Sequence, residues 1–124
     1  MSGFIDELKD RLKSAKKVDG GSFSEATINV YVSNFRKVYK LFTGDNNATP
    51  PDMNFLKDTS KVSEAILSAG GKPNTRLNYY NAILIVMDAM KYPDKKVKEV
   101  YEVKRQAVKK IVEDARSVNK GLTP

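Results

Sequence analysis

The 124-residue chain has no cysteine, no histidine and no tryptophan. The lack of cysteine excludes disulfides, thiolate metal sites and cysteine nucleophiles. The lack of histidine removes the commonest general base and the commonest nitrogen ligand of metals. Neither a glycine-rich phosphate loop nor an acidic calcium-binding loop occurs in the sequence. We therefore expect a protein that binds rather than catalyses, that has no cofactor or metal, and that is not an enzyme on its own.

Long apolar runs are also missing. No stretch approaches the ~18 apolar residues that a membrane-spanning helix needs. The first residues lack the charged and apolar regions of a secretory signal. These absences predict an intracellular protein of the cytoplasm, the nucleus or a virion, with no membrane partner.

The charge of the chain is uneven. The formal net charge is +7. Residues 91–124 carry ten basic and five acidic side chains, residues 1–17 carry five and three, and residues 18–90 carry seven of each. A basic excess attracts nucleic acid, anionic lipid or acidic partners, and charge alone does not choose among them.

Apolar residues recur at helical spacing along most of the sequence, and no alternation of period two lasts long enough for a strand. The pattern predicts an all-α fold of four to five helices. A thin apolar stripe marks a first helix that packs on the rest of the chain or on another copy; its residues are Phe4, Ile5, Leu8, Leu12 and Ala15. The other helices are expected over residues 24–41, from Asp58 or Ser60 to Ala69, over 74–90, and from about 94 to 119. The last is long and is expected to reach beyond the core, and its stripe is a second candidate surface for a homo-oligomer.

Turn residues divide these helices into three regions. They are an N-terminal helix and linker (1–21), a helical body (22–92) and a long basic C-terminal helix with its tail (93–124). Ser22 or Ser24 is expected to cap the second helix, and Asn74 or Thr75 the fourth. The third helix is expected to turn Val62, Ile66 and Leu67 inward, and the fourth, as the most apolar, to lie at the centre of the core.

Two helix starts carry the candidate binding residues. Exposed backbone N–H groups at a helix start, together with threonine, asparagine and arginine, suit phosphate oxygens and base edges. At the second helix the candidate is Thr27, which is equally well explained as a residue of the capped first turn. At the fourth helix the candidates are Lys72, Asn74, Thr75, Arg76, Asn78 and Tyr79. Asparagine can pair with adenine and arginine with guanine, while lysine and threonine hold phosphate.

A third group of candidates is the basic run in the middle of the chain, Arg36, Lys37 and Lys40. No acidic residue occurs between Glu25 and Asp45. A phosphate-binding stripe and an ordinary solvated helix face explain this run equally well.

Three short motifs occur in a fixed order: Ser-x-x-Thr-x-x-x-Tyr from Ser24, the Phe55-Leu56 turn, and Pro73-Asn74-Thr75-Arg76. This order resembles the N-terminal core-binding domain of tyrosine recombinases, the SAM-like domain of phage-type integrases. Similar modules occur in proteins of large DNA viruses. The resemblance covers residues 22–92 and implies a SAM-like helical bundle that grips one side of double-stranded DNA, while a separate catalytic domain closes the other side. That catalytic domain, with its Arg, Lys, His and Tyr constellation, is missing here, so the chain is expected to be a fragment or a stand-alone relative.

The leading hypothesis is thus a non-catalytic DNA-binding module. Its rival is a helical protein-interaction or self-assembling structural protein. A third reading is a virion-packaged basic protein that coats nucleic acid without sequence preference.

Overall fold

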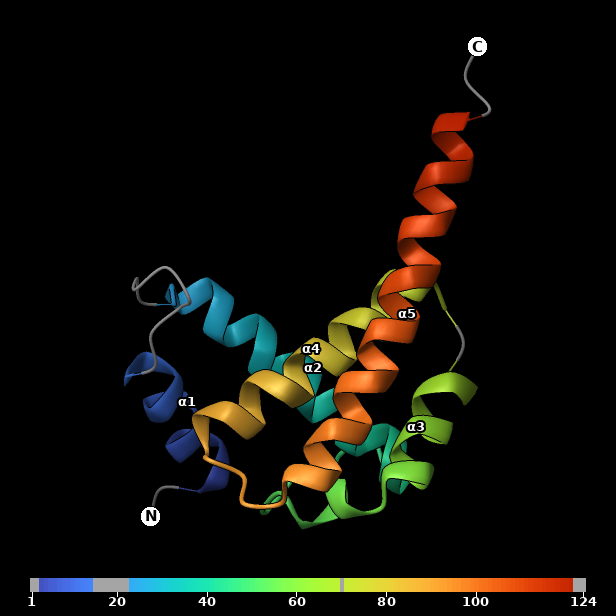
Figure 1. The fold of residues 1–124 in the computed structure, drawn as a ribbon. Coiled ribbons are helices and arrows are strands. Elements are labelled where there is room, and N and C mark those ends of the chain that lie inside the picture. The colour runs from blue at the N-terminus through green and yellow to red at the C-terminus, as the bar shows by residue number, and fades with distance from the viewer. Residues whose placement is uncertain (1–2, 15–22, 70, 122–124) are drawn as a thin grey trace.

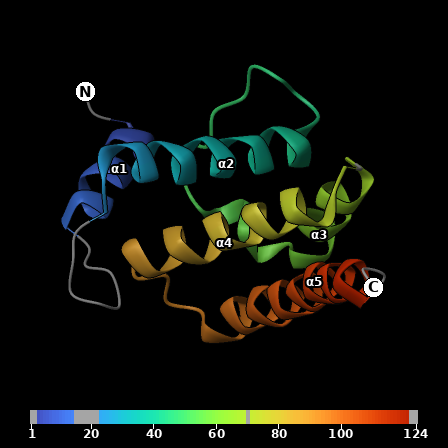
Figure 2. The same cartoon turned by 90° about the horizontal axis from the view of Figure 1, so that it is seen from above.

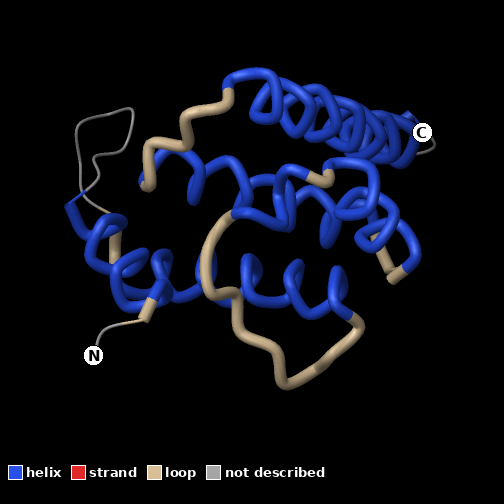
Figure 3. The backbone as a smooth tube through the Cα atoms, turned by 90° about the horizontal axis from the view of Figure 1, so that it is seen from below, coloured by secondary structure: helices blue, strands red, loops and turns tan. Residues whose placement is uncertain are grey.

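The structure, a computed structural model, describes residues 3–14, 23–69 and 71–121, and side chains as far as Ala115. Within these residues every regular element is helical, which confirms the all-α prediction (Figure 3). Ala15 of the expected first stripe, the linker up to Ser22 and the last three residues lie outside the described part. The elements in chain order are α1 (Phe4–Ser14), α2 (Glu25–Thr43), the 3-10 helix η1 (Asn54–Lys57), α3 (Thr59–Ser68), α4 (Pro73–Ala89) and α5 (Lys95–Gly121).

Helix α4 occupies the centre of the molecule, between α2 and α5 (Figure 2). Its buried residues are Tyr80, Ala82, Ile83, Val86 and Met87. They point to several sides of the helix, because neighbours surround most of α4. The prediction that this helix lies at the centre of the core is confirmed.

Helix α1 packs against α2 and α4. Leu8 and Leu12 lie four residues apart on one face, and both are fully buried. The apolar stripe of the first helix is therefore used within the chain, as the first of its two predicted roles required.

The Phe-Leu turn becomes η1 and inserts an aromatic ring between the helices. The ring of Phe55 lies 4.9 Å from that of Tyr39, 5.4 Å from that of Phe42 and 5.5 Å from that of Phe35, measured between centroids. Such tilted and edge-on pairs are favourable beyond the area they bury. Phe55 and Leu56 are both buried, so this short turn anchors the chain between α2 and α3.

Helix ends follow the polar residues of the sequence. Ser24 caps α2, and its Oγ accepts the N–H of Thr27 at 3.1 Å. Asp58 caps α3 by accepting the N–H of Lys61, and Asp94 accepts the N–H groups of Lys96 and Val97 at the start of α5. Each carboxylate or hydroxyl satisfies a backbone donor that a helix start leaves free.

Two details of the predicted helices are wrong. Helix α4 begins at Pro73 after Lys72, with no side-chain cap, so neither Asn74 nor Thr75 caps it. Proline suits the first helical position because its φ is already set and it has no N–H to satisfy. Leu67 is 61% exposed rather than inward, because the adjacent Ile66 takes the buried position and the helix turns ~100° per residue.

Helix α5 packs against α4. Tyr101 in the first half is fully buried, and Val112 in the second half is still buried. The last turns up to Gly121 leave the body (Figure 1), which confirms that the last helix reaches beyond the core. None of the helices in the described ranges is long and apolar enough to cross a membrane.

Candidate nucleic-acid interface

A groove lined by apolar and uncharged polar side chains separates the first half of α2 from α4. It encloses a cavity of 340 Å³ lined by Ala26, Thr27, Val30, Tyr31, Asn34, Asn78 and Asn81. We call it the amide groove, after its three asparagine side chains. None of the residues that line it is charged. The groove thus offers hydrogen-bond donors and acceptors together, which suits base edges as well as phosphate and sugar.

The spacing of asparagines along α4 explains why they meet at this groove. Asn74, Asn78 and Asn81 stand at positions i, i+4 and i+7, which share one face of a helix. The buried residues of α4 occupy its other faces, which pack against the neighbouring helices. The asparagine row therefore occupies the strip of α4 that remains open between α2 and α5.

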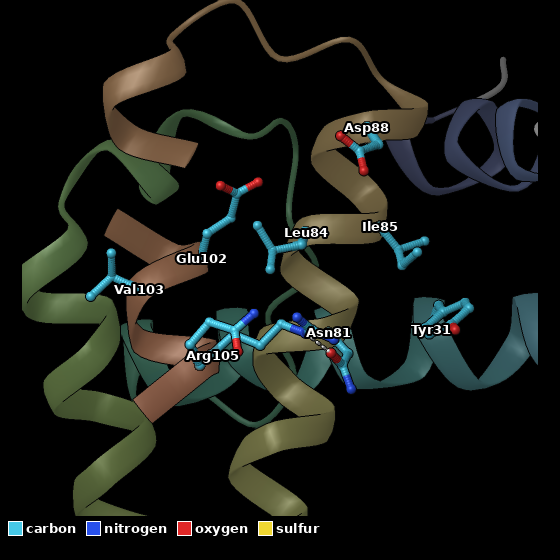
Figure 4. A pocket seen from close by; sticks show the side chains of 9 residues that line it. Tyr31, Asn81, Leu84, Ile85, Asp88, Glu102, Val103 and Arg105 are labelled. Atoms are coloured by element: carbon cyan, nitrogen blue, oxygen red, sulfur yellow. Dashed lines mark hydrogen bonds between the residues drawn. The ribbon is translucent and has the colours of Figure 1, made fainter. Parts of the chain in front are cut away.

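Helix α5 forms the far wall of the site. A second cavity of 730 Å³ shares Tyr31 and Asn81 with the amide groove and adds Arg105, Gln106 and Glu102 from α5. Figure 4 shows Arg105 reaching from α5 to Asn81, where its Nε donates a hydrogen bond to Oδ1. This bond holds the amide of Asn81 in one orientation, with its NH₂ group left to donate.

The acidic residues of the site gather at its opposite end. Asp88 and Glu102 line the larger cavity away from Asn81 and Arg105 (Figure 4). Asp88 forms an ion pair with Lys98. The hydrogen bond to Asp88 raises the pKa of the Lys98 ammonium above its ordinary value. A polyanion is therefore disfavoured beside Asp88 and Glu102, whereas the uncharged Thr27 and Asn78 end does not repel it.

The structure brings two of the sequence-predicted residues together. Thr27 of α2 and Asn78 of α4 line the same 340 Å³ cavity, although 51 positions separate them. The Oγ1 atom of Thr27 also accepts a hydrogen bond from Ser24 Oγ at 2.9 Å. The cap role of this turn is thus confirmed, while a contact of Thr27 with DNA stays a prediction.

The basic run of α2 does not join the groove. Arg36 follows Thr27 by nine residues, which places the two about 180° apart around the helix. Lys37 is exposed and Lys40 half-buried. The guanidinium Nε of Arg36 is inaccessible and has no hydrogen-bond partner among the described residues. These three cations form a separate flank of the molecule.

The remaining predicted residues divide between the surface and the core. Lys72, Asn74, Thr75 and Asn78 are exposed, as a binding role requires. Arg76 and Tyr79 are less accessible than the other candidates: both are half-buried, and Tyr79 packs against the core cluster. Because α4 is central, even positions beside its main apolar stripe meet a neighbouring helix.

Arg76 lines a different cleft, between α3, α4 and α5. This cleft has a volume of 550 Å³, and Leu67, Tyr80 and Val108 form much of its apolar wall. Its charged members are Glu64, Arg76 and Lys104. Two residues correspond to a rotation of about 200° around the helix, so Arg76 and Asn78 lie on different sides of α4.

Three residues of the site were missed from the sequence: Asn34, Asn81 and Arg105. Asn34 follows Thr27 by seven residues, and Asn81 follows Asn78 by three. Both spacings keep one face of a helix, and that periodicity was the available signal. Arg105 carried no such signal, because its place depends on how α5 packs against α4.

No known protein family, curated protein or solved structure is significantly similar to this chain. The resemblance to recombinase core-binding domains therefore rests on the order of the three sequence motifs.

Proposed function

We propose that this chain is a non-catalytic DNA-binding module, as its resemblance to a recombinase core-binding domain implies. The duplex would lie against the amide groove and two cations of α5, Arg105 and Lys109. The observation that carries this proposal is the meeting of Thr27 and Asn78 in one uncharged cavity, whose neighbouring cavity is lined by Arg105. Two residues predicted separately from the sequence thus contribute to one surface.

Phosphate contacts would come from the rim of this surface. Arg105 and Lys109 stand four residues apart on the same flank of α5, and both are half-buried. Lys72 stands exposed at the start of α4. Such cations supply most of the sequence-independent affinity for DNA, and their binding releases counterions.

Fluorescence anisotropy of a labelled random-sequence duplex tests this function at two or more salt concentrations. We expect binding to weaken steeply with salt. The double variant Arg105→Ala/Lys109→Ala should bind more weakly, and its log-log salt slope should fall by about 2, roughly one unit per lost phosphate contact. The matched control is Lys37→Ala/Lys40→Ala, which removes the same charge from the opposite flank of α2.

Two results would overturn the proposal. One is the absence of binding at low salt by the folded wild-type protein. The other is an equal loss of affinity in both double variants, which would indicate attraction by net charge without a defined surface.

A second candidate function is protein interaction at the cleft between α3 and α5. Leu67 is exposed at this cleft, and Ile111 lies one turn beyond Ala107 of its wall. Apolar side chains at such a rim suit a partner helix or a second copy of the chain. Sedimentation of the wild type and of Leu67→Glu discriminates this function: a salt-insensitive oligomer that the variant dissolves, without DNA affinity, would support it.

A further inference from the structure

We propose that Asn74 and Asn78 recognise adenine bases through the major groove, and that the module therefore prefers A·T-containing sequences. This inference rests on the proposed function, because it specifies what the same surface binds. It distinguishes a sequence reader from a protein that only coats DNA.

Two members of the asparagine row, Asn74 and Asn78, have no structural explanation within the described chain. Asn74 does not cap α4, which starts at Pro73 without a side-chain cap. Asn74 and Asn78 are exposed, and neither makes a side-chain hydrogen bond to another described residue. Asparagine forms helices less readily than alanine by roughly 0.7 kcal/mol per residue. Asparagines repeated along one strip thus weaken α4 without a structural return.

The third member of the row fixes the floor of the site. Asn81 is half-buried, and its Oδ1 accepts the Nε–H of Arg105. This bond ties α4 to α5 at a residue that lines the same cavity as Asn78. The reading residues therefore project from a helix whose position is held on both sides, by α2 and by α5.

The chemistry of an amide matches adenine in particular. A carboxamide presents one acceptor and one donor side by side, and adenine presents N6–H₂ and N7 in the major groove. A phosphate offers only acceptors, so a site built for phosphate alone has no use for the amide oxygen. Guanine offers two acceptors at the same edge and would leave that oxygen unpaired.

The spacing of the two residues sets the spacing of the bases. Four residues of α-helix rise about 6 Å. Successive bases of one strand are about 3.4 Å apart. Asn74 and Asn78 thus match bases two steps apart, and we expect two adenines with one intervening base.

A selection from randomised duplexes, followed by anisotropy on the enriched duplex and a scrambled one, tests this inference. We expect enrichment of the spaced adenines and about hundredfold tighter binding of the enriched duplex, roughly tenfold for each of the two asparagine–adenine pairs. Asn78→Ala should lose about tenfold on the enriched duplex and nothing on the scrambled one. The control Asn29→Ala removes an exposed asparagine from the far side of α2 and should change neither affinity.

Replacement of each adenine by 7-deazaadenine removes the N7 acceptor without disturbing base pairing. The wild type should bind the duplex more weakly when either adenine is replaced. Asn78→Ala should show no additional loss of affinity when the replaced adenine is the one that Asn78 contacts. Salt-sensitive binding without any enrichment would overturn the inference and leave the proposed function standing. Enrichment that is insensitive to both Asn74→Ala and Asn78→Ala would also overturn it. Absence of binding at low salt would instead overturn the proposed function itself.

Discussion

The phenolic hydroxyl of Tyr101 in α5 donates a 2.6 Å hydrogen bond to the carbonyl oxygen of Leu56 in η1, and both residues are fully buried. Lys98 and Arg105, on the same side of α5, hydrogen-bond to Asp88 and Asn81 of α4. Helix α5 is thus fixed along its first half by a row of polar contacts. The position of Arg105 beside the amide groove depends on this row.

Tyr101→Phe removes the central bond of the row. The buried carbonyl of Leu56 would lose its partner, and we expect the free energy of unfolding to fall by about 1–3 kcal/mol. Urea denaturation followed by circular dichroism measures the change. Tyr92→Phe is the matched control, because the hydroxyl of Tyr92 is inaccessible and has no hydrogen-bond partner among the described residues. This control should leave stability unchanged within about 0.5 kcal/mol or raise it.

The burial of the Tyr101 hydroxyl leads us to expect a loss of stability at alkaline pH. Burial raises the pKa of the Tyr101 hydroxyl above its ordinary value of 10.0. Above pH 10 the unfolded chain releases this proton while the folded chain keeps it, so the unfolded state binds fewer protons and stability falls as pH rises. Below pH 10 the contribution is fully present. Denaturation of wild type and Tyr101→Phe between pH 8 and pH 11 should show a steeper decline in the wild type, and parallel curves would contradict the prediction.

Backbone geometry at two helix ends predicts opposite effects of substitution. Gly44 follows α2 with φ of 74°, and Lys91 follows α4 with φ of 53°. Side chains with a Cβ are disfavoured in this left-handed region by roughly 1–2 kcal/mol. Gly44→Ala should therefore destabilise by about 1 kcal/mol although space around it is open, and Lys91→Gly should stabilise by about 0.5 kcal/mol. If both variants are stabilised, or both are destabilised, the prediction is wrong.

The first turn of α2 depends on one serine. Ser24→Ala removes the acceptor of the Thr27 N–H and should cost about 1 kcal/mol. Ser33→Ala, at an exposed interior position of the same helix, should be neutral or stabilise slightly, because alanine forms helices more readily. If the two variants have the same melting temperature, the hydrogen bond of Ser24 does not stabilise this turn.

The helices were predictable because their signals are local. Apolar spacing locates α1 to α5, and serine, aspartate and glycine mark most of their ends. The errors occur where the packing of neighbouring helices decides which apolar residue is buried. Leu67 fits the apolar pattern of α3 as well as Ile66 does, and only the position of the other helices leaves it exposed.

The candidate site was predictable only in part. Thr27 and Asn78 each carry a local signal, but their meeting depends on the packing of α2 against α4. Arg76 has the right chemistry and the wrong direction, since it lies against the α3–α5 cleft. Residue type thus identified candidate residues, and the tertiary structure determined which of them line the groove.

Two substitutions of Arg105 separate its structural role from its charge. Arg105→Gln loses the cation, whereas Arg105→Lys keeps it but cannot reproduce the guanidinium Nε–H that Asn81 accepts. Both should therefore lower stability by about 1 kcal/mol. Only Arg105→Gln should weaken binding of a random duplex and reduce the salt slope, by about one unit. If Arg105→Gln binds DNA as tightly as Arg105→Lys, the residue positions Asn81 and does not contact phosphate, and Lys109 and Lys72 become the cations to test next.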